Sequence, residues 1–418
     1  MKSDRQIFHL LSFEGPDPYA RAGGIATRVD GLARALAALG FETHLWFIGD
    51  PDLPASEHHG SLHLHRWCQW ISRLSPAGVY VDEEGKRRDY AASLPPHLVS
   101  DYIVPAVARR ARVTVVAEEW QTFHAVLHLD WLLRIEGLRQ SADILWNANN
   151  VFGFDAIEWP RLKAAATVTT VSRYMRQRMW QHGVDALVVP NGLPPEAFRP
   201  VDRDAVARLR QQTRARVVLG KVARWDPDKR WLLAVDTVAE LKRSGRRPLL
   251  IARGGLEAHG AEVLEHARTL ALRVVERRQS GSGVAELVAS TADLDDVDVL
   301  SLQAPLSADA CRTLFRAADA VLVNSGHEPF GLVGLESMAV GGITCVGGTG
   351  EDYALAGWDA LVLQSADPGE LVRQYLRLES DPKQAAALRR RAAAAARRYS
   401  WDEVIRRNLL PYLGIAEP

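Results

Sequence analysis

Short apolar runs alternate along the chain with longer segments whose apolar residues recur at helical spacing. The runs show little polar alternation, which is typical of strands buried on both faces of a parallel sheet. In the first helical segment, Val29, Leu32 and Leu36 lie on one face, and Gly40 offers a stop. The pattern predicts an α/β protein. Its expected strands are residues 6–12, 43–48, 62–67, 113–117, 143–147, 167–171, 186–189, 217–223, 248–252, 298–302, 319–324, 343–346 and 360–363.

A proline-rich segment near the middle divides this pattern into two halves. Residues 189–195 contain three prolines and an Asn-Gly pair, which is typical of a linker. Each half is long enough for its own doubly wound sheet and core. We therefore expect a first domain at residues 1–192 and a second at 193–400. Residues 68–102 interrupt the pattern and are expected to be irregular, whereas the Ala/Arg-rich residues 384–398 predict a solvated helix.

Composition and charge exclude several classes of protein. Among 418 residues, 47% are hydrophobic and 24% are charged, which excludes disorder and collagen-like structure. Lys+Arg and Asp+Glu both number 51, so we expect no nucleic-acid partner. No apolar run approaches the ~20 residues needed to span a bilayer, and the N-terminus lacks the apolar core of a signal peptide. Three distant cysteines fit neither a disulfide framework nor a zinc site. The sequence predicts a cytoplasmic protein without stable membrane insertion.

The first candidate site is the pair Gly23-Gly24, between the first expected strand and the first expected helix. Glycine lets the backbone approach a ligand closely, and a helix N-terminus carries partial positive charge. The G-x-G-x-x-G pattern of dinucleotide sites is absent. An anion site and a plain glycine turn are therefore the two interpretations of this pair.

The second candidate site follows the first expected strand of the second half. Arg224 and Lys229 flank a turn that contains Pro227-Asp228, and a helical segment comes next. Cations at the carboxyl end of a parallel strand face the region where α/β proteins bind ligands. The alternative is a surface loop rich in charge.

The third candidate site is the segment from Ser325 to Glu336. An expected strand leads into a loop that carries Glu328, and a helix follows. Glu336 lies about two turns inside that helix, so the two carboxylates could be up to ~12 Å apart along its axis. Free helix amides near Gly331 and Leu332 lie between them in sequence. The arrangement suits an elongated, phosphorylated ligand.

Two other motifs carry weaker signals. Four histidines crowd into residues 58–65, but no cysteine or carboxylate pattern converges on them, so we expect surface histidines rather than a metal site. Residues 347–350, Gly-Gly-Thr-Gly, lack the Gly-Lys-Ser/Thr of a Walker site. They predict a glycine turn near the ligand.

Taken in order, these motifs resemble a known family of enzymes. Gly23-Gly24, Arg-x4-Lys at 224–229 and Glu-Pro-Phe-Gly-Leu-x3-Glu-Ser at 328–337 resemble the retaining nucleotide-sugar glycosyltransferases of family 4. The resemblance spans nearly the whole chain. It implies the GT-B fold, in which two doubly wound Rossmann-like domains face each other across a cleft. It also implies that a C-terminal helix at residues 401–418 completes the first, acceptor domain, while the second binds the donor.

The resemblance also implies a role for each matched residue. Arg224, Lys229 and the amides of Gly331 and Leu332 would neutralise the donor diphosphate. Glu336 would hold the ribose hydroxyls, and Glu328 would contact the transferred sugar. The remaining members of the expected donor site are Gly23, Gly24 and Phe330. A nucleoside-diphosphate sugar linked to UDP, GDP or ADP would be the co-substrate, with no metal and no other cofactor.

The chain departs from the family pattern at two positions. Many relatives carry a histidine that touches the donor sugar, and Glu118 is the expected occupant of its place here. As a carboxylate in the first domain, Glu118 could also act as base or nucleophile. Arg230 stands where relatives often have glycine. The first departure leaves the identity of the donor sugar open.

The acceptor, a small molecule or glycan with a hydroxyl group, would be bound by loops of the first domain. Candidates are residues 14–21, 68–102 and 147–155. A nucleotide-sugar epimerase and a catalytically silent binding module are the alternative functions.

Overall fold

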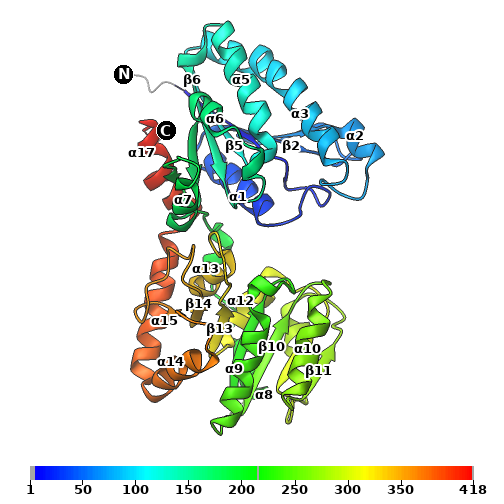
Figure 1. Cartoon of the computed structure of the whole chain (residues 1–418), viewed down its shortest axis with the longest axis vertical. Helices are drawn as coiled ribbons and strands as arrows, with labels where there is room; N and C mark the ends of the chain where they lie inside the picture. Colours follow the sequence, from blue (N-terminus) through cyan, green and yellow to red (C-terminus); the bar gives the residue numbers. More distant parts are fainter. Residues whose placement is uncertain (1–4, 214–215, 417–418) are drawn as a thin grey trace. The chain divides into compact units, whose positions relative to one another are not determined.

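The computed structural model describes residues 5–213 and 216–416, which form two compact units. Unit 1 contains the chain up to Pro194 together with the segment from Tyr399 onward, and unit 2 contains Pro195–Arg398. In Figure 1, unit 1 runs from blue to green and includes the red C-terminal segment. The expected boundary at residues 192/193 lies two residues before the division between the units.

Unit 1 is built on one largely parallel sheet with the strand order β3-β4-β2-β1-β5-β6-β7-β8. All seven strands expected in this half are present. The antiparallel β3 is an addition, because the polar run Ser-Glu-His-His carries no apolar signal. The strands are β1 (Gln6–Leu11), β2 (Glu42–Ile48), β3 (Ser56–His59), β4 (Leu62–Trp67), β5 (Arg112–Glu118), β6 (Ala142–Ala148), β7 (Thr167–Thr170) and β8 (Leu187–Val188).

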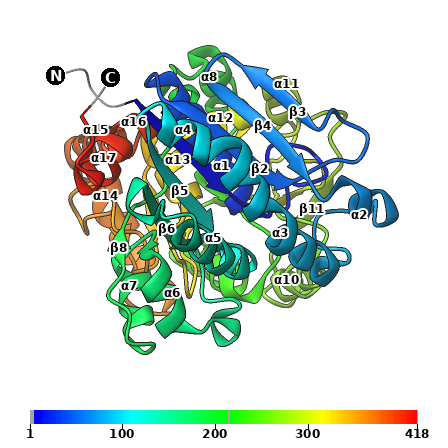
Figure 2. The same cartoon turned by 90° about the horizontal axis from the view of Figure 1, so that it is seen from above.

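Helices cover this sheet, and some of them are formed by the region that was expected to be irregular. Residues 68–102 form α2 (Gln69–Leu74), α3 (Glu83–His97) and most of a π-helix at Leu98–Ile103, so that prediction was wrong. α3 buries Tyr90 and Leu94 despite its charged first half, and it lies beside α5 in both Figure 1 and Figure 2. The other helices are α1 (Gly24–Ala38), α4 (Val104–Ala108), α5 (Phe123–Ile135), α6 (Trp159–Ala165) and α7 (Arg173–Trp180).

The C-terminal segment returns to complete the core of unit 1. α16 (Trp401–Val404), a π-helix (Ile405–Leu409) and α17 (Leu410–Leu413) bury apolar side chains in the cluster that also holds α1. Leu193 N donates to Tyr399 O (2.7 Å) and Trp401 N donates to Leu193 O (3.0 Å). The Trp401 ring fills the space beside Gly31 and Gly192, where a Cβ atom would clash with it.

Unit 2 is a second parallel sheet, with the order β11-β12-β10-β9-β13-β14-β15. Its strands are β9 (Val217–Val222), β10 (Pro248–Arg253), β11 (Val274–Arg277), β12 (Val299–Leu302), β13 (Ala320–Val323), β14 (Thr344–Val346) and β15 (Leu361–Val362). The edge strand β11 was missed because its last two residues are charged. The helices of unit 2 are α8 (Arg203–Gln212), α9 (Trp231–Arg243), α10 (His259–Thr269), α11 (Val284–Ala289), α12 (Ala308–Ala317), α13 (Leu332–Ala339), α14 (Pro368–Ser380) and α15 (Pro382–Arg397).

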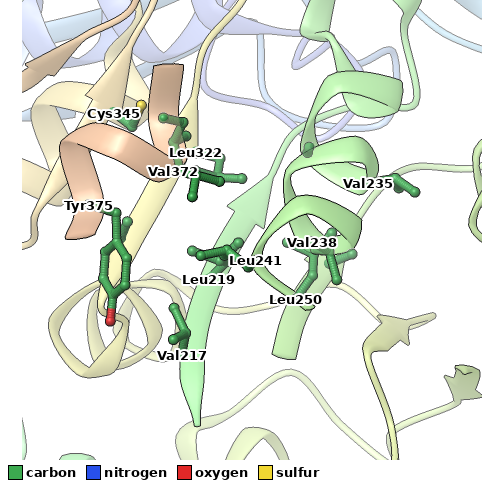
Figure 3. Close-up of a cluster of buried hydrophobic side chains, with 14 of the residues drawn as sticks. Val217, Leu219, Val235, Val238, Leu241, Leu250, Leu322, Cys345, Val372 and Tyr375 are labelled. Carbon is green, nitrogen blue, oxygen red and sulfur yellow. The ribbon is translucent and has the colours of Figure 1, made fainter. Parts of the chain in front are cut away.

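Figure 3 shows the apolar contact that holds these helices on the sheet. Leu219 of β9, Leu250 of β10 and Leu322 of β13 lie in one buried cluster with Val238 of α9 and Val372 of α14. Because both faces of the sheet are covered, its strands are apolar along their length, as the sequence indicated. α15 confirms the helix expected at residues 384–398. In the two described ranges, no helix has the length and apolar character needed to cross a bilayer.

Candidate active site

Two neighbouring loops of unit 2 carry Lys229 and Glu328. β9 and β13 are paired and parallel, so the loops that follow them leave the same edge of the sheet. Gly326 N donates to Asp228 O (2.7 Å), and Lys229 Nζ lies 2.7 Å from Glu328 Oε2. The structure therefore brings these two predicted residues into direct contact.

Turn chemistry shapes the loop that holds Lys229. The Asp226 side chain accepts a hydrogen bond from Asp228 N (2.9 Å) and caps the 3₁₀ turn Pro227–Lys229. Arg230 then has φ of +50°, in the left-handed region, before α9 begins. Glycine adopts this conformation without a steric cost, which explains its preference at this position in relatives.

Arg224 is an exposed cation at the start of the same loop. Its carbonyl accepts a hydrogen bond from Trp231 Nε1 (2.7 Å), which fixes the backbone. Glu257 Oε2 accepts from Trp225 N (2.9 Å). The backbone amides of Glu257 and Trp225 lower the pKa of Glu257, and the charge of Arg224 adds to this effect. The backbone that carries Arg224 is thus fixed near the carboxyl end of β9.

Glu328 is fixed by the glycine-rich segment at 347–350, which lies against its loop. Glu328 N donates to Thr349 Oγ1 (2.9 Å), and Gly350 N donates to Glu328 O (2.8 Å). Ser325 Oγ donates to Glu328 Oε2 (3.0 Å), so the carboxylate is shared between a hydroxyl and Lys229. The side chain is about one-fifth exposed, at 20%. It can therefore exchange a protein partner for a ligand.

The N-terminus of α13 begins directly after this loop. Gly331 has φ of +78° and serves as its N-cap residue. Its carbonyl accepts a hydrogen bond from Tyr353 Oη (2.5 Å), and the buried Phe330 ring packs edge-on against Tyr353. The amides of Leu332 and its neighbours in the first turn precede the intrahelical hydrogen bonds. This end of the helix can accept an anion.

Glu336 lies inside α13 in an apolar setting. Burial raises the pKa of its carboxyl to about 7. Cys311 is close enough for the Glu336 charge to raise the thiol pKa further beyond the effect of burial. Within the described part of the chain, Glu336 has no ion-pair partner. Glu336 is partly exposed, and a carboxylate without a cation can accept hydrogen bonds from the hydroxyl groups of a ligand.

In unit 1, Gly23 is the N-cap residue of α1 and Gly24 is its first residue, and both are exposed. Neither has φ in the left-handed region, and a Cβ atom at either position would meet nothing within 4 Å in the described chain. The fold itself thus gives no reason for two glycines, which favours close approach of a ligand. However, the buried Glu14 carboxylate already accepts from Gly23 N (2.9 Å) and Ala26 N (3.0 Å). An internal anion therefore holds part of this helix end.

Glu118 does not lie where a ligand could reach its carboxylate. It is 0% exposed, and both oxygens accept from Arg28 Nε at 3.0 and 3.2 Å. Asn147 Nδ2 and Asn149 Nδ2 each donate to Oε2 at 2.8 Å. This placement is at odds with the expected sugar contact, because the last residue of β5 points into the unit and forms a buried ion pair.

The next residue, Glu119, was not singled out from the sequence. Its φ of +68° is unusual for a non-glycine residue, and such strain clusters at functional sites. Asn149 N donates to Glu119 Oε1 (2.6 Å), while burial raises the pKa of the carboxyl to about 8. The adjacent charge of Glu118 adds to the shift. The one signal in the sequence for Glu119 was its place in a pair of glutamates directly after an expected strand.

The histidine-rich region is packed rather than superficial at its centre. His65 is buried and stacks on Trp46 with ring centroids 3.8 Å apart, so the expectation of surface histidines was wrong for this residue. His58 and His63 face each other on the exposed hairpin. Among the described residues, no group of three or more His, Cys, Asp or Glu side chains is arranged to hold a metal ion.

The comparisons with known families follow the same division into two parts. Two doubly wound units, each built on a largely parallel sheet, are the architecture of the GT-B fold. Residues 22–197 match the model of Glycosyltransferase Family 4, and residues 208–397 match that of Glycosyl transferases group 1. The chain belongs to the family 4 glycosyltransferases.

Curated relatives carry a more specific name. A D-inositol 3-phosphate glycosyltransferase of Thermobispora bispora is 25% identical over 418 aligned residues, which cover 92% of this chain and 88% of the relative. One of the same name from Frankia alni is 31% identical over 237 residues, covering 55% of this chain and 53% of the relative.

Solved structures share the fold at lower identity. Sucrose-phosphate synthase from Thermosynechococcus elongatus superimposes with a TM-score of 0.68 at 20% identity, over 98% of this chain and 99% of the other. The catalytic domain of starch synthase IV from Arabidopsis thaliana, bound to ADP and acarbose, gives 0.66 at 15% identity, over 97% and 99%. Anabaena HepE in complex with UDP gives 0.64 at 16% identity, over 98% and 100%.

Proposed function

We propose that this glycosyltransferase moves a sugar from a nucleoside-diphosphate sugar to a hydroxyl acceptor and retains the anomeric configuration. The observation that carries the proposal is the Lys229–Glu328 ion pair beside the N-terminus of α13. A cation, a carboxylate and a helix N-terminus are thereby gathered in unit 2. The family membership supplies the reaction class, and these residues suggest how the reaction proceeds.

The diphosphate is the leaving group, so its growing negative charge needs stabilisation. Arg224, Lys229 and the amides of Gly331 and Leu332 are the groups that we assign to this task. A single preorganised donor to such charge contributes about 3–4 kcal/mol to transition-state stabilisation. This set provides positive charge without a metal ion. Turnover should therefore persist in the presence of EDTA.

Glu328 and Glu336 are assigned to the other parts of the donor. When Lys229 turns to the diphosphate, Glu328 loses its cation and becomes available to the sugar, where positive charge develops in the transition state. Glu336, which has no ion-pair partner among the described residues, would accept hydrogen bonds from the ribose hydroxyls. Gly24 would allow close approach of the diphosphate from unit 1, with Gly23 and Phe330 as supporting members of the site.

Retention without a covalent intermediate is supported by the surroundings of Glu118. A double displacement needs an accessible nucleophile, and an inverting transfer needs a general base on the acceptor side. The hydrogen bonds to Arg28 and two asparagines occupy the Glu118 carboxylate. We therefore infer front-face transfer, in which a diphosphate oxygen takes the proton from the acceptor hydroxyl.

Unit 1 offers a place for the acceptor. A pocket of about 420 Å³ is lined by Tyr19, Arg21 and Tyr80, from two of the loops expected to bind the acceptor. The Arg21 side chain is about half exposed, lies 3.7 Å from the Asp30 carboxylate and supplies a cation to the lining of this pocket. Because curated relatives are named for D-inositol 3-phosphate, a phosphorylated polyol is the first acceptor to test here.

The decisive experiment starts from donor binding. UDP, GDP and ADP and their sugars are added in a thermal-shift panel, since a ligand that binds only the folded state raises the melting temperature. The donor found is then used with an acceptor panel, and the released diphosphate is measured. Stabilisation by none of these nucleotides would contradict the proposal.

A matched pair of variants tests the assignment of Lys229. Lys229→Ala should lower turnover by about 100-fold. Lys242 forms an ion pair with Asp298 at the same distance of 2.7 Å but lies in α9, away from the loop. Lys242→Ala should therefore keep turnover within about twofold, because this ion pair lies outside the proposed donor site.

A further inference from the structure

Lys221 is a buried amine beneath the loops of the proposed donor site. It lies near the end of β9 and is only 1% exposed. Lysine side chains are almost never fully buried unless they are paired. Nζ donates to Leu322 O (3.2 Å) and Asn324 Oδ1 (3.1 Å), both neutral acceptors on or next to β13. Within the described chain it has no carboxylate partner, so its burial is costly and asks for an explanation.

Through these contacts Lys221 joins the two loops that carry the donor residues. On one side, Nζ lies 5.1 Å from the centroid of the Trp231 ring, whose Nε1 donates to Arg224 O. On the other side, Asn324 precedes Ser325, whose hydroxyl donates to Glu328. The amine thus supports the backbone at Arg224 and the carboxylate at Glu328 together.

The titratable groups that face Lys221 come from three elements. Lys229 lies on the turn after β9, Glu328 on the loop after β13, and Cys345 on β14. Burial, together with the charge of Lys229, lowers the pKa of Lys221 to about 7, while Cys345 and Glu328 oppose the shift. At pH 8 the side chain is therefore mostly a neutral amine. An anion that arrives above it would favour the ammonium form.

We infer that Lys221 is a positioning residue that binds a proton when the diphosphate of the donor binds. The lone pair of Nζ accepts the proton from solvent, and the resulting ammonium keeps its hydrogen bonds to Leu322 and Asn324. Its new charge then helps Lys229 to balance the diphosphate. The inference rests on the proposed function, because it requires a diphosphate at this site.

Isothermal titration calorimetry measures the proton directly. UDP, GDP and ADP are titrated in turn into the full chain at pH 8 in buffers of different ionisation enthalpy. At this pH the phosphates, whose last pKa is about 6, are fully ionised and release nothing. If diphosphate binding raises the pKa of Lys221 from about 7 to about 8, the wild type takes up about 0.4 proton.

Two variants of Lys221 and one control assign that proton. Lys221→Met removes the titrating group, and Lys221→Arg keeps a permanent charge, so neither should take up a proton. Lys221→Met should also bind the diphosphate about twofold more weakly at pH 8, which is the loss that a pKa change from about 7 to about 8 implies at this pH. A purely structural role of Lys221 would leave the proton uptake of both variants equal to that of the wild type. Glu351, another buried group near Glu328, has its pKa raised to about 7 by burial. Glu351→Gln should retain the uptake of the wild type.

The outcomes separate this inference from the proposed function. Uptake that disappears in a folded Lys221 variant and persists in Glu351→Gln supports it. Diphosphate binding without uptake in the wild type, or with equal uptake in a folded Lys221 variant, overturns the role of Lys221 and leaves the proposed function standing. The absence of binding by all three diphosphates contradicts both.

Discussion

At the scale of single residues, Glu328 and Glu336 differ in what surrounds them. Glu328 is partly exposed and paired with Lys229, whereas burial raises the pKa of Glu336 to about 7. Two carboxylates in such different surroundings suit different parts of one ligand. The account assigns the sugar to the first and the ribose to the second.

Removal of the two carboxylates should therefore have different effects on nucleotide affinity and on sugar transfer. Glu336→Ala should weaken a free nucleoside diphosphate by about tenfold or more, because its ribose loses a charged hydrogen-bond acceptor. Glu328→Ala should leave that affinity nearly unchanged and damage transfer instead. Calorimetry with the free diphosphate checks both variants. Equal losses of affinity would show that the roles are wrongly assigned.

A second prediction concerns the buried Arg28–Glu118 pair. Arg28→Met should destabilise unit 1 by about 3–5 kcal/mol, because it leaves an uncompensated buried carboxylate. Arg34, six residues later in the same helix, pairs with Asp30 at the surface, so Arg34→Met should cost less than about 0.5 kcal/mol. Hydrogen exchange of the unit 1 strands measures both. Similar costs would mean that burial does not set the strength of the pair.

These residues also show what the sequence could and could not predict about the site. Lys229 and Glu328 were both expected from motifs at the ends of expected strands, but their ion pair was not predicted, because it depends on the sheet order that places β9 beside β13. The direction of Glu118 could not be inferred, because it depends on Arg28, 90 positions away in the chain. Lys221 lies within an apolar run, which indicates that the strand is buried. The run does not show which groups the amine of Lys221 contacts.

At the scale of secondary-structure elements, a row of histidines joins three strands of unit 1. His9 on β1 stacks on His44 on β2 (4.6 Å), and His65 on β4 lies within hydrogen-bond distance of His44 (3.0 Å). Burial lowers the pKa of both His44 and His65 to about 3, and neighbouring histidines add to the shift. The row is therefore neutral in the folded protein over the physiological range.

This row predicts a loss of stability in mild acid. Below pH 6.5 the unfolded chain binds protons at His44 and His65 that the folded chain, with pKa values of about 3, does not. Unfolding is therefore favoured as the pH falls, by about 2 kcal/mol between pH 6.5 and 5.5 for the two groups.

The control must allow for buried carboxyl groups, whose effect on the pH dependence of stability is opposite to that of the histidines. Burial raises the pKa of Glu119 to about 8, so acid stabilises the folded form at that group. Hydrogen exchange of β2 and β4 should thus be compared between the wild type and His44→Phe/His65→Phe. The variant should lack the histidine part of the pH dependence. Identical pH slopes in the two proteins would contradict the explanation.

The elements themselves were predictable wherever burial left an apolar signal. The parallel strands of both cores were expected from uninterrupted apolar runs. α3 was missed because charged residues fill its first turns, and its burial of Tyr90 and Leu94 depends on contact with α5. β3 and β11 are edge strands with polar residues, so their pairing depends on neighbours that a local pattern does not contain.

At the scale of the whole molecule, the chain leaves unit 1, forms unit 2 and then returns. The returning helices supply part of the first core, so unit 1 needs both ends of the sequence. The family resemblance implied this return at residues 401–418. The local pattern alone predicts only a short amphipathic helix and does not say where it packs. Trp401 is its main anchor.

Removing that anchor should have a large effect. Trp401 is 2% exposed, so Trp401→Ala should lower the free energy of unfolding of unit 1 by about 3–5 kcal/mol. Trp358 is 53% exposed and stacks on Arg391, so Trp358→Ala should cost less than about 1 kcal/mol. Hydrogen exchange of the unit 1 strands separates them. Unchanged protection in Trp401→Ala would mean that unit 1 is stable without its returning helices.

The central claim is retaining transfer from a nucleoside-diphosphate sugar, and proton NMR of the first product tests it most directly. The account predicts that the anomeric coupling of the product matches that of the donor. Inversion at the anomeric carbon would contradict the front-face mechanism, since we assign the groups around Lys229 and α13 to the leaving group and none of them to a base on the opposite side.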